Sequence, residues 1–545
     1  MSIFSTGLSG LNAAQNALST TSNNISNVYT PGYNREVTLL GESRADGGVE
    51  VNDIQRQFNQ YVASQLNAAT SKSSALEAYR QQVDQIDSLL ADRDAGLAPL
   101  MQNFFSALED LASAPADPAA RQGVLGSVDT LSAQFRSFDG YLQDMQEGIN
   151  GQIADEVTQI NNTTEQLAGI NREIILARAR TGEAPNGLLN QRDQLVNALS
   201  ERMDVRLNIQ DGKTYNVSLP NGQPLVAGTN HYKLQAMESP ADPQRSVLGY
   251  RDFAGNLVAL EENIVTGGTL GGLMDFRAET LDKTQNQIGQ LAVSLAVGVN
   301  AQHREGLDLN SEPGEALFTI GAPQAYSYDR NSGSAVASPR FDEANLDGLR
   351  ASDYTIRVLA DNPSTAGGFE VVRKDSGTAV EALFASDTLS FAGVQVDFQG
   401  LSSAKQGDRF EIQPVRRAAA GIESAIRDLD KIAAASNSGG SGNNENALRL
   451  QELQEQSLVG GSASFSGAYG VMVSDVGNRT NIVQANLDAQ QGLTDQLRAV
   501  QQSESGVNLD EEAANLIRYQ QYYQANAKVI ETGQTVIDTI LGLRN

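Results

Sequence analysis

Cysteine and tryptophan are absent from this 545-residue chain, and histidine occurs only twice, at His231 and His303. Without cysteine, disulfide frameworks, thiolate nucleophiles and cysteine metal sites are excluded. Two histidines far apart in the sequence leave general-base chemistry and histidine-rich metal sites with almost no candidate residues. We therefore expect no catalytic residue, no cofactor and no metal ion, and read the protein as a non-enzyme.

Positive charge is also scarce, and the formal net charge is −27. A phosphate-binding surface needs clustered lysine and arginine, so nucleic acid is not an expected partner. No apolar run reaches the roughly 18 residues of a membrane span, so we expect no membrane insertion. A cleavable secretory signal needs a basic start, yet the first charged side chain is Arg35. By these criteria the protein is cytoplasmic, unless an exporter reads an uncleaved N-terminus.

Both ends of the chain carry apolar residues at alternating spacings of four and three, the pattern of a coiled-coil seam. Glutamine and serine interrupt both seams, so each helix alone should be weakly stable. We expect the terminal helices to pair with each other or with neighbouring subunits, as parts of an assembly. The predicted interface comprises Phe4, Leu8, Leu11, Leu18 and Ile25 near the N-terminus, and Leu509, Leu516, Tyr523, Ile530, Ile537 and Leu541 near the C-terminus.

Long helices are expected to follow the N-terminal segment, over about 53–112 and 119–180. The second continues the four–three pattern at Ile153, Val157, Ile160, Thr164, Leu167, Asn171 and Ile174. From residue 205 alternating segments, with turn signals at Asp211-Gly212 and Asn221-Gly222, predict β-hairpins. We expect helix again over about 268–303, a second β-rich stretch over about 315–414, and helix from 416 onward.

The predicted fold class is multidomain α + β. Terminal helices form a coiled-coil-like bundle, and a long-helix domain carries β-rich middle domains. The expected divisions are 1–50 (assembly helix and extended segment), 51–204 (long helices), 205–265 (first β-rich part), 266–314 (helical return), 315–415 (β-rich outer domain), 416–505 (C-terminal part of the helical domain) and 506–545 (C-terminal assembly helix).

Motifs at both ends narrow this interpretation. Residues 23–27 (Asn-Asn-Ile-Ser-Asn) precede residues 30–33 (Thr-Pro-Gly-Tyr), and residues 507–516 form a second motif with Tyr519-Gln520 beyond it. The pair resembles the N- and C-terminal signatures of bacterial flagellar rod, hook and hook-associated proteins. The motif residues carried over from the N-terminal signature are Asn23, Asn24, Asn27, Pro31, Gly32 and Tyr33.

Interior motifs are similar to the hook-associated members of that family. They are residues 117–121 (Asp-Pro-Ala-Ala-Arg), 189–195, 271–277 and 300–310. The resemblance implies a structural subunit that joins the flagellar hook to the filament and has no catalytic activity. It also implies export without signal cleavage, so that the mature protein is extracellular. The implied partners are the hook protein, a second hook–filament junction protein, further copies in a ring, and a cytoplasmic chaperone at the C-terminal helix.

Several local patterns have two interpretations. The asparagines at 23–27 fit a polymerisation contact or a helix C-cap, since asparagine tolerates left-handed backbone. The run Asp510-Glu511-Glu512 is best explained as a negative first turn at a helix N-terminus rather than a carboxylate site. Asp308, Asn310 and Glu312 are spaced as in a calcium loop, but the glycine and the downstream acid of that pattern are missing.

The sequence alone leaves two other functions open. The chain could be another axial protein of the flagellum, such as hook protein or a flagellin-like subunit. It could also be an axial subunit with a hydrolase inserted in its β-rich middle, for which only carboxylates are plentiful enough.

Overall fold

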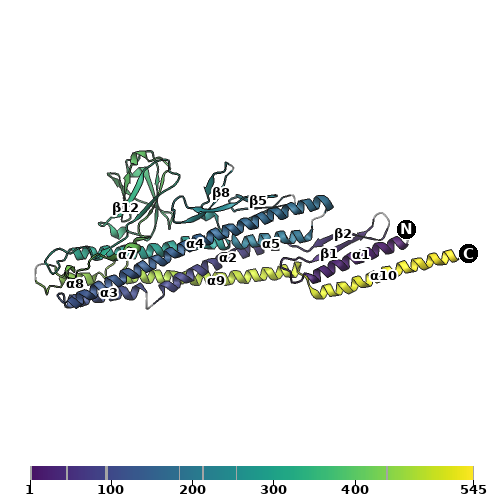
Figure 1. The fold of residues 1–545 in the computed structure, drawn as a ribbon, viewed down its shortest axis with the longest axis horizontal. Coiled ribbons are helices and arrows are strands. Elements are labelled where there is room, and N and C mark those ends of the chain that lie inside the picture. Colours follow the sequence, from purple (N-terminus) through teal and green to yellow (C-terminus); the bar gives the residue numbers. More distant parts are fainter. Residues whose placement is uncertain are drawn as a thin grey trace.

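The computed structural model describes residues 3–43, 47–92, 96–182, 185–210, 214–252, 254–436 and 440–543. The molecule is long and narrow: helices form a shaft, and both termini lie at one end of it (Figure 1). Two β-rich units sit along one side of the shaft at and beyond its middle. No helix in the described ranges is long and apolar enough to cross a membrane.

The end that carries the termini is a small bundle, here called the terminal bundle. Helix α1 (Ile3–Ser26) lies beside α10 (Leu509–Gly542), as the apolar seams of the two ends predicted (Figure 1). Strands β1 (Glu36–Glu42) and β2 (Val49–Arg56) form an antiparallel ribbon that packs on α1. A two-stranded ribbon is marginal by itself, so this one depends on the helix beneath it.

The shaft consists of helices that run out from the terminal bundle and return to it. Their bounds are α2 (Gln60–Leu90), α3 (Leu97–Ser113), α4 (Pro118–Thr181), α5 (Asn186–Arg202), α6 (Gly268–Phe276), the π-helical turn η2 (Arg277–Leu281), α7 (Asp282–Arg304), α8 (Glu445–Glu452) and α9 (Phe465–Ser505). All seven four–three positions predicted between residues 153 and 174 are buried in α4. The expected helix over 53–112 is wrong in detail, because strand β2 occupies its start and two helices share the rest.

The first β-rich unit, here the inner unit, packs against α4. Its strands are β3 (Arg206–Gln210), β4 (Thr214–Ser218), β5 (Pro224–Ala227), β6 (Asn230–His231), β7 (Leu234–Glu238), β8 (Ser246–Arg251) and β9 (Leu257–Ala259), in one four-stranded and one three-stranded sheet. The predicted Asn221-Gly222 turn is confirmed between β4 and β5, with Gly222 at φ +91°. The Asp211-Gly212 turn lies outside the described residues.

The second β-rich unit, here the outer unit, has two sheets and an apolar core of its own. One sheet contains β11 (Gln324–Ser327), β19 (Arg409–Gln413), β13 (Tyr354–Val358), β14 (Phe369–Arg373) and β15 (Ala379–Val380); the other contains β12 (Val336–Phe341), β18 (Val394–Gln399), β17 (Thr388–Phe391) and β16 (Leu383–Ala385). The Phe398 ring contacts those of both Phe369 and Phe410 in this core. A larger core runs through the shaft and the inner unit.

Irregular structure fills the return to the shaft. Strand β10 (Phe318–Thr319) pairs with β20 (Glu423–Ser424). Single turns of 3₁₀ helix are η1 (Glu262–Ile264), η3 (Leu346–Gly348), η4 (Ala366–Gly368), η5 (Leu401–Ser403), η6 (Ala418–Gly421) and η7 (Leu429–Lys431). The expectation of helix from 416 onward is therefore wrong until α8. Buried Arg121 donates to the carbonyls of Leu429 and Ile432, which this irregular backbone leaves available.

Close packing of α6 on α2 yields the first prediction. Replacing Gly272 by alanine should lower the free energy of unfolding by about 1–3 kcal/mol. A Cβ at this position would lie 2.1 Å from the backbone oxygen of Ala75, which cannot move away without displacing α2. Urea unfolding followed by circular dichroism measures the change.

The matched control is Gly123→Ala on α4, where a Cβ has no neighbour within 4 Å. Alanine is the better helix former, so this variant should gain up to about 1 kcal/mol. Equal unfolding midpoints for the two variants would show that α6 and α2 are not in close contact in solution.

Candidate assembly site

Small residues make the contact between α1 and α10. A Cβ on Gly7 would lie 2.7 Å from the Ile530 side chain, and one on Gly10 would lie 2.2 Å from the Asn526 side chain, so a larger residue at either position would displace a side chain of α10. On the other helix Gly533 is buried against Phe4. The buried residues of α1 are Gly7, Gly10, Ala13, Ala14, Ala17, Thr20, Thr21 and Asn24.

The larger apolar residues of the predicted seams lie at the edges of this contact. Phe4, Leu11, Leu18, Ile25, Leu516 and Ile530 are half-buried. The other five predicted seam residues are exposed: Leu8, Leu509, Tyr523, Ile537 and Leu541. The helices pair as expected, but within one chain the contact leaves much of their apolar surface open to solvent.

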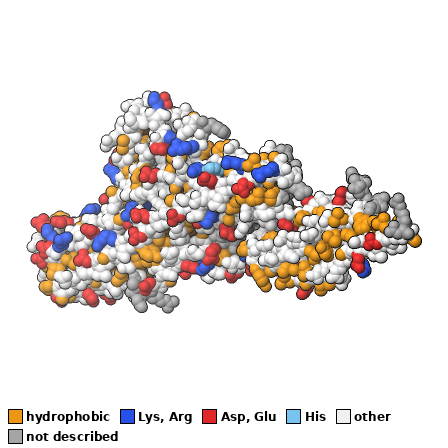
Figure 2. Space-filling model, turned by 45° about the vertical axis from the view of Figure 1, so that its right-hand side comes forward, with side chains coloured by type: hydrophobic (Ala, Val, Ile, Leu, Met, Phe, Trp, Pro, Cys, Tyr) orange, Lys and Arg blue, Asp and Glu red, His pale blue; other side chains and the backbone are white. Residues whose placement is uncertain are grey.

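A second exposed apolar row on α10 was missed from the sequence. Tyr522, Val529, Val536 and Leu543 recur every seven residues, and Ile540 lies near them; all are exposed. Seven residues return a helix to nearly the same face, so this spacing was the signal that could have revealed the row. Figure 2 shows hydrophobic side chains gathered along the terminal bundle. Helix α10 therefore presents apolar surface beyond what α1 covers.

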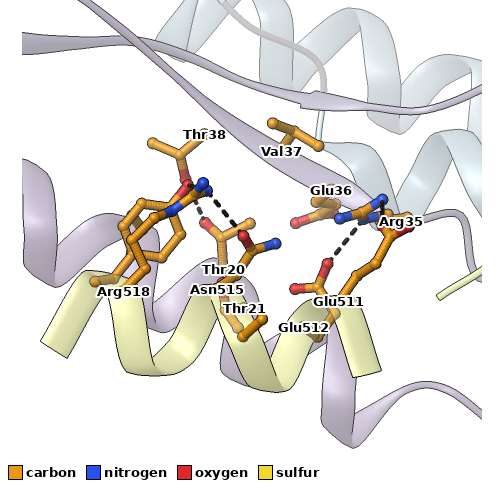
Figure 3. Close-up of a pocket in the computed structure, with 13 residues that line it drawn as sticks. Thr20, Thr21, Arg35, Glu36, Val37, Thr38, Glu511, Glu512, Asn515 and Arg518 are labelled. Atoms are coloured by element: carbon orange, nitrogen blue, oxygen red, sulfur yellow. Dashed lines mark hydrogen bonds and ion pairs between the residues drawn. The ribbon is translucent and has the colours of Figure 1, made fainter. Parts of the chain in front are cut away.

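A buried ion pair joins the two chain ends. Arg35 Nε donates to Glu512 Oε1 at 2.8 Å, and Arg35 Nη1 donates to Glu511 Oε2 at 2.8 Å (Figure 3). Glu512 is only 2% exposed whereas Glu511 is 57% exposed. The Arg35 backbone N–H also donates to the Ser505 carbonyl at 2.8 Å, at the end of α9. Arg35 thus binds the N-terminal segment to both C-terminal helices.

Asn24 completes this arrangement, which we call the clasp. Its amide donates to the Glu36 carbonyl at 2.8 Å and to Glu512 at 3.1 Å. Its side-chain oxygen accepts from the Tyr33 hydroxyl at 2.8 Å and from the Glu36 backbone N–H at 2.9 Å. Burial, with nearby Glu36 and Glu512, raises the pKa of Tyr33, so its hydroxyl keeps the proton that it donates. Burial likewise raises the pKa of Glu36.

The other motif residues shape the turn after α1. The Tyr33 N–H donates to the Thr30 carbonyl at 3.2 Å, which closes a turn around Pro31 and Gly32. Gly32 has φ +77°, as the predicted proline–glycine turn requires. Asn27 donates from its side chain to the Asn23 carbonyl at 2.9 Å and so caps the helix end. Residues 23–27 all have negative φ, so the left-handed form of the cap is wrong.

A pocket of about 360 Å³ opens beside the clasp, between α1, β1 and α10 (Figure 3). Its floor includes Thr20 and Thr38, whose hydroxyls are 2.9 Å apart, and its rim includes Arg35 and Arg518. Among the described residues no group of histidine, aspartate and glutamate is arranged to hold a metal ion. In this pocket the charged groups bind segments of the chain to one another.

A second polar contact attaches the terminal bundle to the shaft. Arg56, at the end of β2, pairs with Asp193 of α5 at 2.6 Å. Asn34 donates to Asn190 at 2.7 Å. Both α5 residues belong to the interior motif at 189–195, so that motif contributes to the junction between the two parts.

Two local candidates have structural explanations. The Asp308 carboxylate accepts from the backbone N–H groups of Asn310 and Glu312 at 2.7 and 2.9 Å, which is a loop turn, not a calcium ligand set. His303 is buried, with Nδ1 2.6 Å from the Glu315 carbonyl and Nε2 accepting from the Ala433 N–H at 2.9 Å. Burial lowers the pKa of His303, so the neutral ring makes both bonds.

Sequence comparison with known proteins identifies the family of this chain. It is 38% identical to flagellar hook-associated protein 1 of Escherichia coli K12 over 555 aligned positions, which cover 100% of both chains. The protein of the same name from Salmonella typhimurium gives 38% with the same coverage, and that from Bacillus subtilis gives 22% over 97% of this chain and 96% of its own. The chain belongs to the flagellar hook-associated protein 1 family.

Family profiles and a solved structure agree with this assignment. The profile described as flagellar hook-associated protein FlgK helical domain matches residues 83–318. A flagella basal body rod protein profile matches 4–34, and a flagellar basal body rod FlgEFG C-terminal profile matches 501–543. The flagellar hook junction protein FlgK of Burkholderia pseudomallei has a similar fold, with a TM-score of 0.75 and 27% identity over 81% of this chain and 99% of its own.

Membership of the family decides between the functions left open by the sequence. A match over the whole length to hook-associated proteins favours that role over hook protein or a flagellin-like subunit. The β-rich middle lies within the aligned length, so it is common to these relatives and is not an insertion particular to this chain. The protein is a structural component of the bacterial flagellum.

The clasp yields the second prediction. Replacing Glu512 by glutamine leaves Arg35 without its buried counter-charge and should loosen α1 and α10. Hydrogen bonds to a charged group contribute about 1.5–3 kcal/mol, so amide exchange in both helices should quicken by about 10- to 100-fold. Hydrogen-exchange mass spectrometry of the full chain measures this rate.

Glu511→Gln is the matched control, because this neighbouring carboxylate bonds the same arginine but is exposed. Exposed pairs contribute at most about 1 kcal/mol, so its effect should be clearly smaller. Similar exchange rates in the two variants would contradict the importance of the buried pair.

His303 yields a prediction about pH. Its folded-state pKa lies below the ordinary value of 6.5, so the unfolded chain takes up a proton first as the pH falls. The stability from neutral His303 is present above pH 6.5 and is lost as the pH falls through the window below it. The chain has two histidines, so NMR can follow each ring after assignment with His303→Gln and His231→Gln.

In the folded protein the His303 ring should stay neutral below pH 6.5, where an ordinary imidazole takes up its proton. His303→Gln should lower the free energy of unfolding by about 1–3 kcal/mol, because the Glu315 carbonyl and the Ala433 N–H lose the ring that binds both of them. It should also flatten the dependence of the free energy of unfolding on pH in this window. A His303 ring that titrates at or above pH 6.5 would refute the assignment of a buried, neutral side chain.

Proposed function

We propose that this chain joins the flagellar hook to the filament, and that copies assemble into a ring through their terminal helices. The observation that carries the proposal is the exposed apolar surface of α10, which α1 leaves uncovered. Exposed apolar patches of this kind mark interaction sites in soluble proteins. The hook protein on one side and a second junction protein on the other are the proposed neighbours of the ring.

Two rows on α10 suggest two different contacts. The row with Leu509, Tyr523 and Leu541 lies on one flank of the α1 contact, and the row with Tyr522, Val529 and Val536 lies on the other. A ring needs each subunit to use two different surfaces, one for each neighbour. Two apolar flanks on one helix meet that requirement.

Assembly and folding of the terminal bundle are proposed to be coupled. Glutamine and serine interrupt the seams, and α1 contains no charged residue to form ion pairs along its surface. Helices of this kind gain most of their stability from packing against a partner. The ends can therefore pass an exporter as unfolded chain, without cleavage, and become ordered when neighbouring subunits cover them.

A chaperone in the cytoplasm is proposed to bind the C-terminal helix before export. The rows that await a neighbouring subunit would otherwise promote aggregation. A groove that accepts an amphipathic helix is the expected mode of binding for residues 507–541. We propose no catalytic activity for the protein, in keeping with the structural role of its relatives.

Val536→Asp tests the assembly surface. The side chain is 45% exposed, so an aspartate should not unfold the isolated protein, but it should place a charge in a subunit contact. Burying an unpaired charge is strongly unfavourable, so incorporation at the hook tip should fall at least tenfold. Electron microscopy of flagella from a complemented deletion strain measures incorporation, with hooks lacking filaments as the expected result.

Thr535→Asp is the matched control, since the adjacent residue is exposed on the polar face of α10 and should tolerate the charge. Purified Val536→Asp protein should also bind the chaperone more weakly than Thr535→Asp in titration calorimetry. Normal filaments with Val536→Asp, or equal defects in both variants, would overturn the proposed role of this row.

A further inference from the structure

Both β-rich units meet the shaft at one buried carboxylate. Asp282 is the first residue of α7, directly after the π-helical turn, and its side chain is 15% exposed. Arg245, from the turn between β7 and β8 of the inner unit, pairs with one oxygen of Asp282. Arg416, which follows β19 of the outer unit, pairs with the other oxygen at 2.9 Å. Each arginine is about 5% exposed.

Further charges surround this centre. Asp353 of the outer unit also pairs with Arg416. Arg277, on the π-helical turn, is fully buried, donates to the Ser246 carbonyl of β8 at 2.8 Å and pairs with Glu262 at 3.0 Å. The charged groups that face one another here come from the shaft, the inner unit and the outer unit. Burial opposes the charge on Asp282, but the arginines keep its pKa below the ordinary value.

Charged groups in a dry site are costly unless each keeps its partner. Hydrogen bonds between them are directional, whereas apolar surfaces tolerate sliding. The outer unit has its own apolar core, so it can keep its fold while its attachment changes. In Figure 1 the two β-rich units rise from the shaft side by side, as a shared attachment requires.

We propose that Asp282, with Arg245 and Arg416, is an ionic joint that fixes the angle of both β-rich units on the shaft. Arg245 holds the inner unit, Arg416 holds the outer unit, and Asp282 holds both. Removing one arginine therefore loosens the attachment of one unit, and removing the carboxylate loosens both. The outer unit, with its own core, should move as a body, whereas the inner unit shares the core of the shaft and keeps its contact with Arg277, so it should move less. The joint is a conformational device that is separate from the assembly surface of the terminal bundle.

Pulsed electron–electron spin resonance on the full chain tests this arrangement. The native chain has no cysteine, so pairs of introduced cysteines carry the only spin labels. Exposed Asn486 on α9 serves as the reference on the shaft; it is paired with Glu381 in the outer unit or with Lys233 in the inner unit, both also exposed. The width of each distance distribution reports how firmly that unit is held.

The joint predicts a pattern across variants. Asp282→Asn should broaden both distributions, the outer one at least twofold and the inner one less, because the inner unit shares the core of the shaft. Arg416→Met should broaden only the outer distribution, and Arg245→Met only the inner one. Asp408→Asn is the matched control, because Asp408 is a buried carboxylate that accepts from the Ser332 and Lys405 backbone N–H groups, both at 2.8 Å, within the outer unit. It should leave both distributions unchanged.

Circular dichroism and the thermal midpoint establish that each variant is folded. If Asp282→Asn does not fold, the two arginine variants still test the division of roles. Unchanged distributions in folded Asp282→Asn would overturn the proposal. So would equal broadening of both units by either arginine variant, because that result indicates general loosening. A normal assembly phenotype of the terminal-bundle variants has no bearing on these outcomes, so the two proposals fail independently.

Discussion

A single buried carboxylate, that of Glu512, determines how the ends of this chain must meet. It is 2% exposed, and a charge so far from water is tolerated only with partners in place. Those partners, Asn24 and Arg35, are 488 and 477 residues away in the sequence. The two ends must therefore lie side by side, and everything between them must leave the terminal bundle and return to it. The helices of the shaft provide that path.

The sequence predicted those features that depend on one helix at a time. Apolar periodicity identified the buried face of α4, because that face packs along the whole length of the helix. The residues that fill the contact between two helices were harder to predict. Large apolar seam residues suggested knobs filling the α1–α10 contact, whereas Gly7 and Gly10 fill it and leave Leu8 and Leu541 exposed. A pattern built on the spacing of large apolar residues does not detect glycine. The pairing of the two helices was therefore predictable, but the residues that make the contact were not.

Charge was harder to interpret than hydrophobicity. In the sequence, Glu511 and Glu512 are equivalent members of an acidic first turn. The structure confirms that both lie in the first turn of α10, where a negative charge stabilises the helix N-terminus. Only the fold separates them, by burying one and leaving the other in water. In the sequence Arg35 is distinguished only as the first charged residue of the chain, although in the structure it pairs with both glutamates. The helix predicted after residue 416 involves a similarly distant partner: two carbonyls of that irregular segment, those of Leu429 and Ile432, accept from Arg121, which is 308 positions from Leu429.

Buried ionic contacts occur at each boundary between the parts of this molecule. Arg35 and Glu512 join the two chain ends, Arg56 and Asp193 join the terminal bundle to the shaft, and Asp282 joins the β-rich units to it. Apolar packing provides most of the stability within each part. Ion pairs add little net stability yet are lost entirely when geometry changes. Ion pairs at the boundaries can therefore hold the parts at defined angles. The apolar rows of α10 are not needed for that purpose and stay available to neighbouring subunits.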